Sequence, residues 1–256
     1  MSANAKIALI TGATAGIGEA CANLYAENGF NLIITGRRAD RLQKIKERLE
    51  SEFKVNVTTL NFDVSDRTAV EKQLNGLKNE LKKVDVLINN AGLSQGFDAF
   101  QDADLTDWET MIDTNVKGLL YVSKIVSNWM ISNKKGHIVN LGSIAGKEVY
   151  ANGNVYCATK HAVDALSKAM RIDLLKHKIR VTAIHPGAVE TEFSEVRFHG
   201  DKEKAKKVYE GYQPLLAEDI AETIYFATSR PAHVNINDLV IMPTVQASAF
   251  YWDKEK

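Results

Sequence analysis

The chain has 256 residues, 45% of them hydrophobic and 25% charged, which is an ordinary composition for a globular protein with a large buried core. No linker rich in proline, glycine or serine divides it, so we expect a single domain over residues 1–256. The 32 basic and 32 acidic residues cancel, and the net charge gives no reason to expect nucleic acid or an anionic membrane as a partner.

Short apolar runs rich in β-branched residues alternate with longer amphipathic stretches along the whole chain. The runs predict strands at residues 6–11, 31–35, 55–62, 84–89, 137–142, 179–185 and 237–242. The amphipathic stretches predict helices at residues 16–28, 39–52, 66–82, 106–132, 153–177 and 217–229. Thr106 and Glu109 form a T-x-x-E pattern, which predicts a capping box at the start of the fourth helix. This order predicts the α/β class: one Rossmann-type, doubly wound domain with a seven-stranded parallel sheet and helices on both faces.

Residues able to bind or react gather where the expected strands end. The residues at or just after these ends are Gly12, Gly36, Asp63, Asn89, Ser143 and Pro186. In open parallel sheets, ligands bind beyond the carboxyl ends of the strands, where the strand order reverses. The sequence therefore predicts one binding crevice at this edge of the sheet.

A glycine-rich turn follows the first expected strand. Gly12, Gly16 and Gly18 occur in TGATAGIG, between an apolar run and a helix-like stretch. Glycine permits a tight turn and the close approach of a pyrophosphate, and the start of the next helix directs free N–H groups and the positive end of its dipole at that anion. The order strand, glycine turn, helix predicts a dinucleotide site.

Tyr156 and Lys160 stand four residues apart in the helix expected over 153–177, so both side chains leave the same face. A nearby cation favours the phenolate, and we expect Lys160 to lower the pKa of Tyr156 toward neutral. Ser143 ends an apolar run thirteen residues earlier, where its hydroxyl is placed to hold a substrate oxygen. Together the three residues predict general acid-base chemistry.

These motifs resemble those of the short-chain dehydrogenase/reductase family over nearly the whole chain. The matching segments are TGATAGIG at 11–18, NNAG at 89–92 and PG at 186–187, together with a tetrad of Asn115, Ser143, Tyr156 and Lys160. The resemblance implies that Asn115 lies at a helix distortion and holds a water connected to Lys160. It also implies a set of cofactor contacts at Gly12, Thr14, Gly16, Ile17, Gly18, Asp63, Val64, Asn90, Ala91, Gly92, Tyr156, Lys160, Pro186, Gly187, Val189 and Thr191.

The residues after the second expected strand bear on which dinucleotide binds. NAD enzymes usually place an acidic residue there, whereas this chain has Arg37 and Arg38 after Gly36. Guanidinium groups suit a 2′-phosphate, so we predict NADP as the cofactor. Because Ala15 takes the place of a basic residue common in NADP-using relatives, the preference depends on Arg37 and Arg38.

Residues 190–214 occupy the place where this family carries a variable substrate lid. Within it, Arg197 stands between apolar neighbours and is a candidate for a substrate carboxylate, with surface exposure as the equal alternative. Gln95 and Tyr150, with Ser143 and Tyr156, are further candidates for the substrate pocket. From about residue 136 to 248 the chain resembles the NADP-dependent serine and 3-hydroxy acid dehydrogenases. The alternatives are a broader carbonyl or 3-oxoacyl reductase, or a non-catalytic regulator that binds NADP.

Cysteine and histidine usage gives no sign of a disulfide framework or a metal site. Cys21 and Cys157 are far apart in sequence, and the six histidines show no metal-ligand spacing. We expect no metal and a reducing compartment. The N-terminal stretch lacks the features of a secretion signal, and no run of about 18 apolar residues occurs. We therefore expect a cytoplasmic protein, and family resemblance implies a homotetramer.

Overall fold

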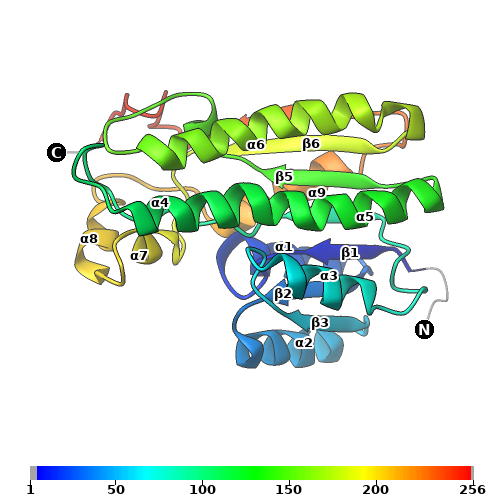
Figure 1. Cartoon of the computed structure of the whole chain (residues 1–256). Helices are drawn as coiled ribbons and strands as arrows, with labels where there is room; N and C mark the ends of the chain where they lie inside the picture. Colours follow the sequence, from blue (N-terminus) through cyan, green and yellow to red (C-terminus); the bar gives the residue numbers. More distant parts are fainter. Residues whose placement is uncertain (1–4, 255–256) are drawn as a thin grey trace.

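The computed structural model describes residues 5–254, which follow the predicted alternation of strands and helices (Figure 1). The strands are β1 Ile7–Ile10, β2 Asn31–Gly36, β3 Val57–Asn61, β4 Val86–Asn89, β5 His137–Leu141, β6 Arg180–Pro186 and β7 Asp238–Ile241. The helices are α1 Gly16–Glu27, α2 Ala39–Phe53, α3 Arg67–Asn75, α4 Leu105–Ile112, α5 Leu119–Asn133, α6 Asn154–Asp173, α7 Phe193–Arg197, α8 Lys202–Lys207 and α9 Ala217–Thr228. Shorter turns are the π-helical η1 Asp113–Gly118 and the 3₁₀ turns η2 Ile144–Gly146 and η3 Leu175–His177.

The strands form one parallel, seven-stranded sheet in the order β3-β2-β1-β4-β5-β6-β7. The chain first builds from β1 outward to β3 and then crosses to the other side of β1 to begin β4. The strand order thus reverses between β1 and β4, where loops from neighbouring strands diverge and leave a crevice. The predicted fold class is confirmed.

The side chains of β1 show that both faces of the sheet are covered. Ala8 and Ile10 belong to a core cluster that includes residues of α1, α2 and α9. Ile7 and Leu9 belong to a second cluster that includes residues of α3 and α5, with Met170 of α6 packed against it. Successive strand residues point to opposite faces, so a strand buried on both must be apolar throughout. Figure 1 shows α5 crossing in front of the sheet as one of these covering helices.

Several predicted helix bounds are wrong. The helix expected over 66–82 ends at Asn75, because Gly76 follows as its C-terminal cap and residues beyond it form turns. The helix expected over 106–132 is divided by η1 into α4 and α5. The helix expected over 153–177 ends at Asp173 and is followed by η3.

The predicted capping box is also wrong. Asp104 is the N-terminal cap of α4, and its carboxylate accepts a hydrogen bond from the N–H of Thr106 at 2.7 Å. Thr106 therefore lies inside the helix. A carboxylate caps well because it also favours the positive end of the helix dipole.

The 190–214 segment contains two short helices, α7 and α8, near the carboxyl ends of the strands (Figure 1, yellow). Val189 pairs with Leu215 in an isolated parallel bridge, so the two ends of the segment lie side by side. No helix within residues 5–254 is long and apolar enough to cross a membrane.

Candidate active site

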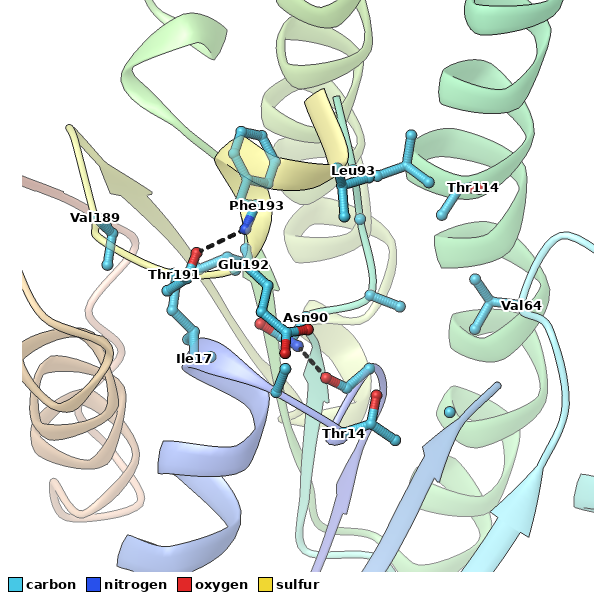
Figure 2. A pocket seen from close by; sticks show the side chains of 18 of the residues that line it. Thr14, Ile17, Val64, Asn90, Leu93, Thr114, Val189, Thr191, Glu192 and Phe193 are labelled. Atoms are coloured by element: carbon cyan, nitrogen blue, oxygen red, sulfur yellow. Dashed lines mark hydrogen bonds between the residues drawn. The ribbon is translucent and has the colours of Figure 1, made fainter. Parts of the chain in front are cut away.

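A cleft with a volume of about 330 Å³ opens at the carboxyl ends of the strands. Its walls contain nearly all of the residues predicted to bind a dinucleotide, Gly18 being the exception. Figure 2 shows side chains from the β1–α1 turn, the β3 end, η1 and the 189–193 segment converging on it. Segments distant in sequence thus form one site.

The glycine turn is shaped for close approach. Gly12 and Gly16 have φ values of +66° and +53°, which side chains other than glycine rarely adopt. A Cβ at Gly18 would stand only 2.3 Å from the carbonyl oxygen of Gly12, so any larger residue would push the turn open. No side chain caps α1 at Ala15, and the first N–H groups of the helix are left for an anion.

Asn90 braces this turn from the neighbouring strand. Its Nδ2 donates hydrogen bonds to the carbonyl oxygens of Thr11 at 2.9 Å and Gly12 at 3.1 Å. The hydroxyl of Thr11 in return accepts from the N–H groups of Asn90 and Ala91. These bonds join β1 to β4 where the strand order reverses, and Asn90 both lines the cleft and fixes its shape.

The β2 end carries the predicted arginines. Arg37 lies 3.5 Å from a carboxylate oxygen of Asp63 and is largely exposed. Arg38 directs Nε and Nη2 at the hydroxyl of Thr14, at 3.2 and 2.9 Å. Both arginines line the cleft. Paired guanidinium donors beside a hydroxyl suit a phosphate group.

Ser143, Tyr156 and Lys160 line the other end of the same cleft. The Ser143 hydroxyl accepts a hydrogen bond from the N–H of Ala145, which fixes its position at the start of η2. Lys160 is buried and donates to the carbonyl oxygen of Leu141 at 2.9 Å. The structure therefore brings the three predicted side chains together.

Burial controls the ionisation of this end of the cleft. It raises the pKa of Tyr156, and the charge of Arg197 and a hydrogen bond with Ser143 oppose this only in part. The expectation that Lys160 lowers this pKa is not met: its Nζ lies 5.9 Å from the Tyr156 ring centroid, and burial lowers its own pKa to about 8. Loss of water around each group favours its neutral form.

Asn115 lies in the π-helical turn η1, so the predicted helix distortion is present. Its side chain bonds to the backbone of Leu93 in both directions, at 2.8 Å each, and donates to the hydroxyl of Thr159 at 3.1 Å. Both amide protons are used in these bonds, and Asn115 does not line the cleft. Its observed effect is to hold Leu93 in the cleft wall.

The three remaining substrate candidates lie just outside the main cleft. Arg197 donates to Ser94 at 3.2 Å and to the hydroxyl of Tyr150 at 3.3 Å, and it lies 5.3 Å from the Tyr156 ring centroid. It is thus directed inward over aromatic rings and does not extend along the surface. Gln95 lines a small second pocket that also reaches Tyr156.

Sequence reasoning missed Glu192 and Arg41. Glu192 lines the cleft and accepts hydrogen bonds from Arg38 at 2.7 Å and from Arg41 at 2.6 Å. Arg41 stands one helical turn beyond Arg37 and Arg38, and this clustering of arginines was the available signal. Nothing in the sequence indicated that Glu192 would meet them.

A charged cluster supports the Ser143 loop from behind. Lys147 Nζ lies 2.9 Å from carboxylate oxygens of both Asp164 and Asp238, and His185 Nδ1 lies 3.2 Å from the carbonyl oxygen of Ser143. Asp164, His185 and Asp238 are close enough together to hold a metal ion. The Lys147 ammonium, however, already supplies the positive charge between the two carboxylates.

The buried Lys160 leads to a prediction about stability and pH. Its pKa is about 8 in the folded chain and 10.5 in the unfolded chain, so its charge destabilises the fold below about pH 8. That penalty disappears between about pH 8 and 10.5, where the unfolded chain binds more protons. Lys160→Met should therefore raise the free energy of unfolding at pH 7 by ~2 kcal/mol, with a smaller gain near pH 9.5. Urea denaturation at both pH values measures this, and an equal gain at both would contradict it.

The family model described as short chain dehydrogenase matches residues 6–202. NADP-dependent 3-hydroxy acid dehydrogenase YdfG of Salmonella typhi is 48% identical over 244 residues, 95% of this chain and 97% of that protein. NADP-dependent 3-hydroxy acid dehydrogenase of Schizosaccharomyces pombe is 44% identical over 245 residues, 95% of both chains.

Solved structures agree with the sequence comparisons. The closed form of a serine dehydrogenase complexed with NADP⁺ has a TM-score of 0.91 and 45% identity, covering 98% of this chain and 100% of that one. Serine dehydrogenase from Escherichia coli has a TM-score of 0.82 and 41% identity, covering 94% of this chain and 99% of that one. The chain belongs to the short-chain dehydrogenase family.

Proposed function

We propose that this protein is an NADP-dependent oxidoreductase that transfers a hydride between NADP(H) and a small 3-hydroxy acid of the serine, L-allo-threonine or 3-hydroxypropionate type. One observation carries the proposal: a single cleft has a glycine turn and two arginines at one end, and Ser143, Tyr156 and Lys160 at the other. Relatives that bear the same activity in their names cover nearly the whole chain.

The residues present fit NADP. The uncapped start of α1 suits the pyrophosphate, and Arg37, Arg38 and the Thr14 hydroxyl suit a 2′-phosphate. No carboxylate takes the place after Gly36 that would favour NAD. When bound, the cofactor supplies or accepts the hydride.

Tyr156 is the proposed acid-base residue. Its raised pKa keeps the phenol protonated at neutral pH, which suits proton donation to the carbonyl oxygen during reduction. In oxidation the alcohol proton passes to the phenolate, a form that Arg197 and Ser143 favour. Ser143 orients the reacting oxygen, and Lys160 has N–H groups beyond the one bound to Leu141 for the cofactor ribose.

Arg197 is the proposed site for the substrate carboxylate. Its guanidinium lies beside the Tyr156 ring, and the 190–214 segment that carries it would act as a lid over the substrate. Tyr150, which bonds to Arg197, and Gln95 in the adjoining small pocket would complete the wall. An acid in this position would place its hydroxyl carbon near Tyr156 and Ser143.

We also propose a homotetramer, as expected from the family. Apolar side chains are exposed on α4 at Leu105, on α5 at Leu120 and on the edge strand β7 at Val240. Burial of such patches between subunits removes them from water. Light scattering of the purified protein measures the assembly directly.

The substrate prediction is tested by rates. Purified protein with NADP⁺ should oxidise serine, L-allo-threonine and 3-hydroxypropionate, and with NADPH should reduce an acetoacetyl thioester far more slowly. Absorbance of NADPH reports all of these reactions. Reduction of the thioester without activity on any free acid would instead favour the broader carbonyl or 3-oxoacyl reductase.

Tyr156→Phe tests the acid-base role. Because it removes only the hydroxyl, turnover should fall by at least about 10²-fold while the Kd for NADPH changes little. Steady-state kinetics and a fluorescence titration provide the two values. An unchanged kcat would remove Tyr156 from this role. A wild type that binds NADPH but shows no turnover would instead favour the non-catalytic NADP-binding regulator.

Arg197→Met tests the carboxylate site. Loss of the guanidinium should raise KM for serine by roughly 10-fold or more, because a charged hydrogen bond contributes about 1.5–3 kcal/mol. Arg197→Lys should recover part of the loss, since it restores the charge without the planar fork. Equal KM values in the wild type and Arg197→Met would place the carboxylate elsewhere.

A further inference from the structure

An ion pair joins the 190–214 segment to the far wall of the cleft. The two oxygens of Glu192 are held separately, one by Nη1 of Arg38 at 2.7 Å and the other by Nη1 of Arg41 at 2.6 Å. These side chains are 40–42% exposed, so solvent screens the pair only in part. Figure 2 shows Glu192 extending from the 191–193 segment into the cleft toward the glycine turn.

Arg38 uses different edges of its guanidinium for different partners. Nε and Nη2, the fork that suits a phosphate, are directed at the hydroxyl of Thr14. Nη1, on the other side, is bound to Glu192. Glu192 thus occupies only the Nη1 edge of Arg38, and the Nε–Nη2 edge faces Thr14, where we place the 2′-phosphate.

The neighbours of Glu192 contact the other parts of the cleft. Thr191 packs against the glycine turn, with its Cγ2 only 3.1 Å from where a Cβ on Gly16 would be. Phe193 packs against Tyr156, with ring centroids 5.6 Å apart. Thr191 thus contacts the glycine turn, Glu192 the arginines and Phe193 the end of the cleft near Tyr156. Because the three residues are successive, a bond that holds Glu192 in place also restrains its two neighbours.

We propose that Glu192 is a latch that bridges Arg38 and Arg41 to hold the 190–214 segment closed over the bound dinucleotide, and so limits how fast the cofactor leaves. The inference rests on the proposed function, because the latch acts only if a dinucleotide occupies the cleft. Glu192 is charged at neutral pH: burial alone would raise its pKa, but the hydrogen bonds from Arg41 and Arg38 lower it below the usual value.

The test is the rate of NADPH release. Glu192→Gln keeps the size of the side chain and removes its charge, and NADPH should leave about three- to tenfold faster, as expected for the loss of a partly exposed two-arginine pair. Stopped-flow fluorescence of bound NADPH measures this rate. Salt should speed release from the wild type more than from the variant, because it screens this ion pair in the wild type alone, whereas it screens the phosphate contacts in both proteins.

Glu195→Gln is the matched control. Glu195 lies on α7, the short helix that begins directly after Glu192, and makes no ion pair among the described residues, so this variant should release NADPH at the wild-type rate. Equal release rates in the wild type and Glu192→Gln would overturn the latch. Tighter NADPH binding by Glu192→Gln would also overturn it, and would identify the carboxylate as a competitor of the 2′-phosphate.

Arg41→Gln completes a double-mutant cycle. If Glu192 acts through Arg41, release from the double variant Glu192→Gln/Arg41→Gln should be little faster than from Glu192→Gln alone. If the double variant instead releases NADPH faster by the product of the two single-variant effects, the two residues act separately and the latch is contradicted. Failure of the wild type to bind NADPH at all would instead refute the proposed function, so the two failures are distinguishable.

Discussion

The strand order reverses between β1 and β4, and the loops that follow these two strands diverge there to form the cleft. The shape of the cleft depends on the hydrogen bonds that join the two loops. Asn90 supplies the bridge, because its amide holds the carbonyl oxygens of Thr11 and Gly12 while the Thr11 hydroxyl holds the backbone after β4. Buried backbone groups need such partners. The same bonds that satisfy them hold the glycine turn open toward the cleft.

Loss of water governs the ionisation of Tyr156 and Lys160 at the opposite end of the cleft. Burial raises the pKa of Tyr156 and lowers that of Lys160 to about 8, so both neutral forms are favoured relative to water. Arg197, on a segment far away in sequence, is the cation that most opposes the shift on Tyr156. The pKa of Tyr156 is therefore coupled to the position of the 190–214 segment, which carries Arg197.

The 190–214 segment is connected to both ends of the cleft. Glu192 joins it to the arginines after β2, and Phe193 and Arg197 join it to Tyr156. Its own helices are short, so its position depends on these contacts more than on a core of its own. The segment thus contacts both the arginines after β2 and the buried Tyr156.

The sequence by itself determined the sheet, its helices and the residues at its carboxyl ends, because apolar periodicity and glycine turns are local signals. Tertiary structure decided which side chains meet across the fold and how deeply they are buried. Asp104, and not Thr106, caps α4 by accepting a hydrogen bond from the N–H of Thr106. The amide of Asn115 donates to the carbonyl oxygen of Leu93. Glu192 accepts hydrogen bonds from Arg38 and Arg41 across the cleft. The pKa of Tyr156 likewise moved opposite to the expectation from its spacing to Lys160. Spacing along a helix gives proximity, whereas burial and long-range partners exist only once the chain has folded.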